Sequence, residues 1–219
     1  MAEINLMDHY PRSKRPIDER ASRVTDADRA IARQFGKDYF DGDRIHGYGG
    51  YHYHPRFWQA TVRRFRDHYG LKPGDRVLDV GCAKGFMLHD FKELIPGLNV
   101  AGIDISEYAI AQANEEVKPF LGVGNAKELP YDSRSFDLVI AINTIHNLDL
   151  PDCKQALREI QRVTRRHAFV VVDAWRNEDE RECLQRWVVT CKTAMHVEDW
   201  KRTFDEVGYN GDYYWFIAE

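Results

Sequence analysis

The sequence predicts an α/β fold in which a parallel β-sheet carries helices on both faces, preceded by an N-terminal segment of helix and loop. From about residue 70 onward, short apolar runs alternate with longer amphipathic segments. This alternation is typical of parallel sheets, because each helix returns the chain to the start of the next strand. The first run, 77–80, stops at a turn of small residues, Gly81, Ala83 and Gly85, from which a helix starts. The chain of 219 residues is therefore expected to hold one such domain with an appendage.

The predicted strands are short and rich in β-branched or aromatic residues, as buried parallel strands usually are. In chain order they cover residues 77–80, 99–105, 119–123, 137–143, 168–172 and 213–217. Ligands of parallel sheets bind beyond the carboxyl ends of the strands, so residues that follow each strand are candidates for a site.

Amphipathic segments predict the helices. They cover residues 25–35, 55–69, 86–95, 107–113, 151–163, 178–190 and 196–207. Thr25 is expected to cap the first of these helices and Gly36 to end it. Ser106 is a candidate cap for a later helix, and Asp152 with Gln155 matches the capping-box pattern.

Two further parts are expected ahead of the α/β domain, which we place at residues 71–219. Residues 1–22 are polar, with several basic residues and prolines, and are expected to form a flexible arm. Residues 23–70 are expected to supply a helix and a lid segment.

The stretch 37–56 is the most unusual part of the sequence, because it combines many glycines with tyrosines and histidines. Glycines predict a loop, but a loop that meets only solvent has no need for so many aromatic rings. We expect a lid over the site, with Tyr48, Tyr51 and His52 as substrate contacts. An aromatic cover packed over the sheet is the competing interpretation. A metal site built from the histidines is the less favoured alternative, because no carboxylate partner is evident for His52 and His54.

The composition argues against several classes of protein. Lys and Arg number 31 against 35 Asp and Glu, which gives a net charge of -4 and no electrostatic footprint for nucleic acid. The 4 cysteines form no CxxC pair and match no zinc site, so a reduced, cytoplasmic protein is the simplest expectation. No signal peptide and no apolar run of membrane-spanning length is visible, so no membrane partner is expected. The oligomeric state is left open, with a homodimer as one alternative.

Asp104 adds a second observation to the glycine turn. It ends the second predicted strand, 19 residues after Gly85. An acid in that place is positioned to accept hydrogen bonds from the hydroxyls of a ribose. The turn and the acid together predict a cofactor that contains a nucleoside.

Four motifs resemble the class I S-adenosylmethionine (SAM)-dependent methyltransferases. Val-Leu-Asp-Val-Gly-Cys-Ala-Lys-Gly at 77–85 resembles motif I, and Gly-Ile-Asp-Ile-Ser at 102–106 resembles motif II. The segments 124–130 and 135–140 resemble the adenine loop and the fourth strand. The resemblance implies a Rossmann-like fold, SAM as the cofactor, and the following SAM contacts: Asp79, Gly81, Cys82, Ala83, Gly85, Asp104, Ile105, Asn125, Ala126 and Asn143.

Two positions depart from the family pattern. The family usually has Gly where Ala83 stands and Asp where Asn125 stands. Alanine adds only a methyl group, and an asparagine side chain still accepts a hydrogen bond through its oxygen.

Methyl transfer to a hydroxyl usually needs a base. His146, shortly after the fourth predicted strand, and Asp173, after the fifth, are the candidate catalytic residues. Packing of the turn is the competing and commoner role for His146, and capping of a loop is the competing role for Asp173. Arg176 is a candidate contact for an acidic or phosphorylated acceptor, although a lone arginine is more often part of a surface ion pair.

The favoured function is methyl transfer to a small molecule. The Gly-Tyr-Gly-Gly-Tyr segment at 47–51 resembles a bacterial subset of the family often linked to surface-polysaccharide or related sugar metabolism. That resemblance implies a hydroxyl of a sugar or nucleotide-linked sugar as the acceptor. The alternatives are N-methylation of a small amine or a protein, an NAD-dependent dehydrogenase, which Asn143 argues against, and a non-catalytic binding module, which Asp104 argues against.

Overall fold

The centre of the fold is a 7-stranded sheet with the order β3-β2-β1-β4-β5-β6, in which β7 also pairs with β5. The computed structural model describes residues 1–11 and 15–218. The strands are β1 (Arg76–Val80), β2 (Asn99–Asp104), β3 (Leu121–Val123), β4 (Phe136–Ile142), β5 (Thr164–Trp175), β6 (Met195–His196) and β7 (Asp212–Phe216). Every pairing between these strands is parallel. The predicted parallel sheet is confirmed, and the order reverses direction between β1 and β4, where such sheets bind ligands.

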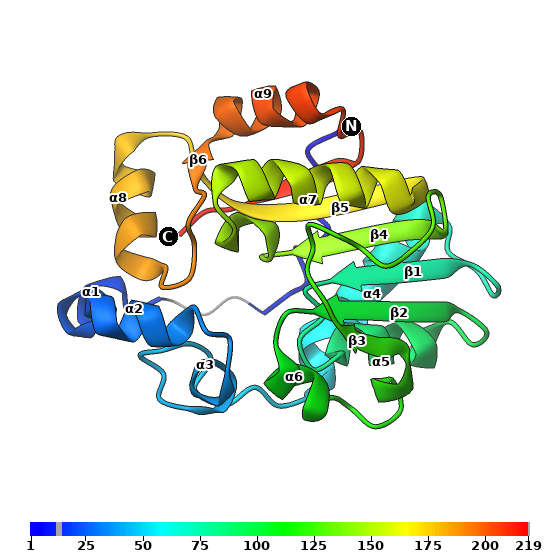
Figure 1. Cartoon of the computed structure of the whole chain (residues 1–219), viewed down its shortest axis with the longest axis horizontal. Coiled ribbons are helices and arrows are strands. Elements are labelled where there is room, and N and C mark those ends of the chain that lie inside the picture. The colour runs from blue at the N-terminus through cyan, green and yellow to red at the C-terminus, as the bar shows by residue number, and fades with distance from the viewer. Residues whose placement is uncertain (12–14, 219) are drawn as a thin grey trace.

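Helices cover both faces of the sheet, as predicted (Figure 1). On one face, α7 (Leu150–Val163) and α9 (Val197–Val207) contribute Ile160 and Phe204 to one core cluster. On the other face, α4 (Pro55–Tyr69) and α5 (Phe86–Leu94) contribute Phe65 and Phe91 to the second cluster. Successive strand residues point to opposite clusters, which is why these strands read as continuous apolar runs.

The remaining helices are short and lie near the carboxyl edge of the sheet or at its β3 end. They are α1 (Ile17–Arg23), α2 (Asp26–Ala32), α3 (Lys37–Asp41), α6 (Glu107–Ala111), α8 (Glu178–Trp187) and the 3-10 turns η1 (Lys118–Phe120) and η2 (Ile145–Asn147). Figure 1 shows α1, α2, α3 and α8 beyond the arrowheads of the strands. No helix within the described residues is long and apolar enough to cross a membrane.

Several predicted boundaries were wrong. Thr25 caps α2 through a capping box with Asp28, but the helix ends at Ala32 rather than near Phe35. The expected loop at 37–56 starts with the helix α3. The capping box predicted for Asp152 and Gln155 does not form, because α7 begins at Leu150 with Asp149 as its N-cap, which places Asp152 inside the first turn of the helix.

The first part of the predicted arm is attached to the sheet. The backbone N–H of Ile4 donates to the carbonyl of Tyr213, and Tyr213 donates to the carbonyl of Ala2. Leu6 is only 1% exposed and belongs to the cluster under α4 and α5. Residues 12–14 of that arm lie outside the described residues.

Candidate functional site

The turn between β1 and α5 passes too close to the residues after β4 to carry a side chain at Gly81. Gly81 has a φ of 86°, and a Cβ atom added there would lie 2.1 Å from Oγ1 of Thr144. Gly85, the N-cap of α5, has a φ of 73°. Ala83 also adopts a left-handed φ, 49°, so the alanine that replaces the family's usual glycine holds a conformation that L-residues avoid.

Asp104 joins this turn to the end of β2. Its Oδ2 accepts a hydrogen bond from the backbone N–H of Ala83, and its Oδ1 accepts one from Ser106, both at 2.8 Å. Burial raises the pKa of this carboxyl, and the two backbone N–H groups act in the opposite direction. The next residue, Ile105, is 54% exposed, so a buried acid and an open apolar face lie side by side at this strand end.

Asp79, near the end of β1, is a second buried acid beside this turn. It is 7% exposed, and its carboxylate makes no hydrogen bond or ion pair with the described part of the chain. Burial, together with the charge of Asp104, raises the pKa of Asp79 to about 7. An acid held in this state favours a cationic ligand, which would supply the missing partner.

The other predicted cofactor contacts lie at the same edge. The N–H of Gly124 donates to the carbonyl of Asp104, which holds the loop with Asn125 and Ala126 against the end of β2. Oδ1 of Asn125 accepts from the N–H of Lys127, so the asparagine closes its own loop as an aspartate would. Asn143, after β4, is exposed and has a φ of 54°. Non-glycine residues held at positive φ cluster at functional sites.

Cys82 is buried in this turn. Burial raises the pKa of its thiol well above the usual range, as do the charges of Asp79 and Asp104. A protonated, buried thiol is a poor nucleophile, so Cys82 serves as a small apolar side chain.

His146 and Asp173 form a buried pair at the ends of β4 and β5. Nδ1 of His146 accepts the backbone N–H of Asp173 at 3.0 Å, and Nε2 lies 3.5 Å from Oδ2 of the same residue. Burial lowers the pKa of His146, although the charge of Asp173 acts against it, and burial raises the pKa of Asp173. The sequence predicted that these residues would share a site, and the structure brings them into contact.

The lid is tied to the turn through an ion pair that the sequence did not suggest. Nζ of Lys84 lies 2.6 Å from Oδ2 of Asp41 and donates to the carbonyl of Tyr51. The hydroxyl of Tyr108 donates to the same carboxylate. Burial alone would raise the pKa of Asp41, but the bonds from Lys84, from the N–H of Tyr51 and from Tyr108 together lower it to about 2.

The predicted lid residues have different fates. Tyr51 stacks on Phe86 of α5 with ring centroids 5.0 Å apart, and Tyr48 lies 4.4 Å from Tyr51. Both tyrosines therefore lie over the start of α5. His52 is exposed, and Arg176 is an exposed residue that pairs with Glu180; a contact of either with the substrate stays a prediction.

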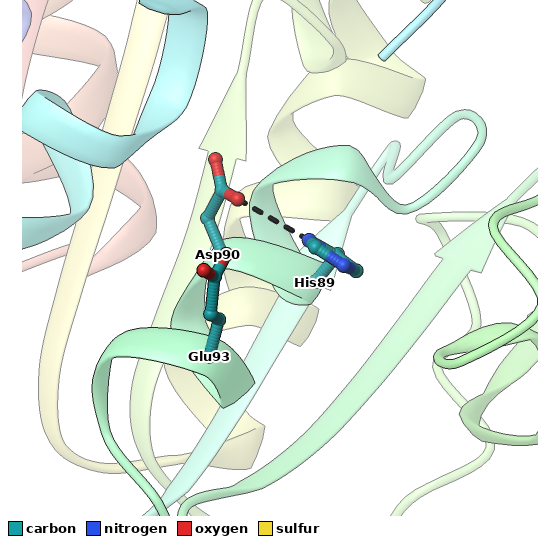
Figure 2. Close-up of side chains that lie close together, drawn as sticks. All are labelled: His89, Asp90 and Glu93. Carbon is teal, nitrogen blue, oxygen red and sulfur yellow. Dashed lines mark hydrogen bonds and ion pairs between the residues drawn. The ribbon is translucent and has the colours of Figure 1, made fainter. Parts of the chain in front are cut away.

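A separate polar cluster lies on α5 (Figure 2). Ligand atoms of His89, Asp90 and Glu93 lie within 4.8 Å of one another. Tyr53 donates to Oδ1 of Asp90 at 2.6 Å, and Nδ1 of His89 lies 3.2 Å from the same oxygen. These bonds fasten the end of the lid to α5.

The sequence missed Lys84 and Asp41 because a lysine in a glycine turn reads as a solvent-exposed residue. One signal was present: Lys84 is the only charged residue in 80–88, among small and apolar neighbours. A charge in such a place needs a partner.

Comparisons with known proteins agree with this geometry. A family model described as a methyltransferase domain matches residues 71–216. The tRNA (carboxymethyluridine(34)-5-O)-methyltransferase of Arabidopsis thaliana is 33% identical over 132 residues, which are 59% of this chain and 31% of that protein. The 27-O-demethylrifamycin SV methyltransferase of Amycolatopsis mediterranei is 32% identical over 120 residues, 49% of this chain and 42% of that protein. The chain thus spans less than half the length of these two relatives.

Among solved structures, the phosphoethanolamine N-methyltransferase 2 of Haemonchus contortus, in complex with phosphomonomethylethanolamine and S-adenosylhomocysteine, has a TM-score of 0.58. The two proteins are 21% identical, and the match covers 81% of this chain and 44% of that one. At this identity the likeness shows the fold.

Proposed function

The chain belongs to the class I SAM-dependent methyltransferases, and from that premise we propose that it transfers a methyl group from SAM to a hydroxyl of a small acceptor, a sugar or nucleotide-linked sugar. The observation that carries the proposal is the junction of the glycine turn with Asp104, because one carboxylate organises both the turn and the end of β2. Smallness at Gly81 and a fixed acid beside it are what an approaching nucleoside requires.

The residues of the crevice fit SAM. Asp79 is a buried carboxylate that lacks a partner in the described chain, and SAM carries positive charge. Asp104 has lone pairs left for ribose hydroxyls, since each oxygen accepts only one backbone N–H. The exposed face of Ile105 suits an adenine ring, and Asn125 would meet its edge. SAM supplies the activated methyl group, and the chain has to hold the acceptor in line with it.

Asp173 and His146 remain the proposed residues for the acceptor's proton. The lone pair on Nδ1 of His146 is used by a backbone N–H, and burial lowers the pKa of this ring. Burial raises the pKa of Asp173, which makes it the better proton acceptor of the two. Through Nε2, His146 would orient that carboxylate and stabilise its charge.

Three alternatives give different results. N-methylation of an amine or protein needs less of a base, and a non-catalytic module needs none. RNA, the acceptor in the Arabidopsis relative's name, is disfavoured here by the net charge of -4.

Incubation with methyl-labelled SAM and a panel of nucleotide-linked sugars, free sugars, small amines and a basic peptide tests the proposal. We expect label in a sugar hydroxyl, with turnover reduced at least about a hundredfold in Asp173→Asn and changed less than about twofold in Asp132→Asn, which alters an exposed acid. Label found only in the amines or the peptide would overturn the assignment of a sugar hydroxyl as the acceptor. Binding of SAM with no transfer to any of these or to a cell extract would favour the module.

A further inference from the structure

A cavity of about 350 Å³ opens between α2, α8 and the end of β5. This size is that of a site for a small metabolite. Its lining residues are Arg29, Arg33, Trp175, Leu184, Gln185, Val188, Cys191, Lys192 and Ala194. They come from α2 and the residue after it, from the end of β5, from the last turn of α8 and from the loop after α8, so the cavity is formed by segments that are far apart in the sequence.

The charge of this cavity is opposite to that of the chain. Arg29, Arg33 and Lys192 line it, and none of its lining residues is acidic, whereas the whole chain has a net charge of -4. Arg29 is fixed by a bond to the carbonyl of Val188. Lys192 has a partner, Asp149, at 3.3 Å on the exposed side. Arg33 is exposed and has no hydrogen bond or ion pair with any described residue.

The cavity adjoins the predicted catalytic pair. Cys191 in its wall donates its Sγ–H toward the carbonyl of His146 and also contacts the carboxyl of Asp173. Trp175 follows Asp173 by two residues on β5, and therefore on the same side of the strand. A ligand in the cavity would contact Trp175 and the three basic side chains, and it could extend toward the buried pair of His146 and Asp173.

We propose that this cavity binds the nucleoside diphosphate part of a nucleotide-linked acceptor, an assignment that rests on the proposed function. Guanidinium groups match phosphate oxygens in geometry and charge, and Lys192 adds a further cation. Trp175 supplies the flat surface against which a base stacks. The sugar attached to the diphosphate would then lie on the side of Asp173 and His146.

Binding of uridine 5′-diphosphate to the full chain, in the presence of S-adenosylhomocysteine and at constant ionic strength, tests the site by calorimetry. We expect the dissociation constant to rise at least about tenfold in Arg33→Glu. The matched control, Arg63→Glu, reverses another exposed arginine, on α4, and should change it less than about twofold. An equal effect of both variants, or no binding by the unmodified chain, would overturn the proposal.

A comparison with inorganic pyrophosphate distinguishes the contribution of the base to binding from that of the phosphates. Trp175→Ala should raise the dissociation constant of uridine diphosphate at least about fivefold and that of pyrophosphate less than about twofold. Equal losses for the two probes would overturn the nucleoside assignment.

Titration of S-adenosylhomocysteine into the same samples distinguishes the two proposals. If it binds and uridine diphosphate does not, the cavity assignment fails and the proposed function stands. If it does not bind and uridine diphosphate does, the proposed function fails and the assignment to a methyl acceptor fails with it.

Discussion

Gly81 is the position at which a single atom decides whether the cofactor turn forms. Its φ of 86° is left-handed, and an added Cβ would overlap the side chain of Thr144 at 2.1 Å. Two costs therefore add at this residue, one from the backbone and one from the clash.

Gly70 separates these costs, because its φ is 60° and nothing lies within 4 Å of an added Cβ. Gly70→Ala should lower the free energy of unfolding by about 1 kcal/mol, the backbone cost alone. Gly81→Ala should lower it by about 3 kcal/mol and also abolish SAM binding. Urea denaturation of the two variants measures this difference; equal losses would show that Thr144 gives way.

At the scale of single residues, the sequence located those positions that a local spacing pattern defines. The sequence placed Asp104 and the small residues of the turn because their spacing follows from the strand–turn–helix unit. It missed the pair of Lys84 and Asp41, 43 positions apart, because a tertiary contact between a turn and a lid leaves no local pattern. The sequence analysis also named Arg176 as a contact for the acceptor; its side chain pairs with Glu180, one helical turn on, and its role toward an acceptor stays a prediction.

At the scale of elements, the lid is fastened to the SAM-binding unit at two places. Near its start, Asp41 pairs with Lys84, whose side chain is 6% exposed. Near its end, Tyr53 donates to Asp90 on α5. Between these two points, Tyr51 stacks on Phe86 at the start of α5, and Tyr48 packs against Tyr51.

Lys84→Met removes one partner of a buried pair and leaves Asp41 uncompensated. We expect the amides of residues 37–53 to exchange with a local opening free energy about 3 kcal/mol lower. Lys118→Met, which breaks the exposed pair with Glu115, should change it by less than about 0.5 kcal/mol.

Hydrogen exchange followed by mass spectrometry measures the protection of these amides in Lys84→Met and in Lys118→Met. Asp41→Asn combined with Lys84→Met should recover part of the protection, since neither charge is then left alone. Unchanged exchange in Lys84→Met would show that the aromatic contacts alone hold the lid.

At the scale of the whole molecule, the sheet and the helices on its faces could be predicted from the sequence. The arrangement of α1, α2, α3 and α8 beyond the carboxyl ends of the strands could not. Strand and helix periods are local, so the sequence located β1 to β5, β7 and most of the helices. The packing of α1 on α8 and the bond from Arg29 of α2 to the carbonyl of Val188 join segments more than 150 positions apart. The same holds for the isolated bridge between Glu3 and Tyr213 of β7 and for the burial of Leu6.

The carboxyl edge of the sheet has an acidic part and a basic part. The crevice at β1 and β2 is acidic, through Asp79 and Asp104, and suits a cationic cofactor. The cavity at β5 is basic and suits an anionic acceptor. The proposed methyl transfer would take place between them, at the ends of β4 and β5 where His146 and Asp173 lie.

Calorimetric titration of SAM into the unmodified chain, beside Asp104→Ala and the control Asp132→Ala, tests the central claim most directly. We predict saturable binding at a single site that is lost in Asp104→Ala and kept in Asp132→Ala, with all three proteins equally folded by circular dichroism. Absence of binding to the unmodified chain, or equal binding by all three, would contradict the account.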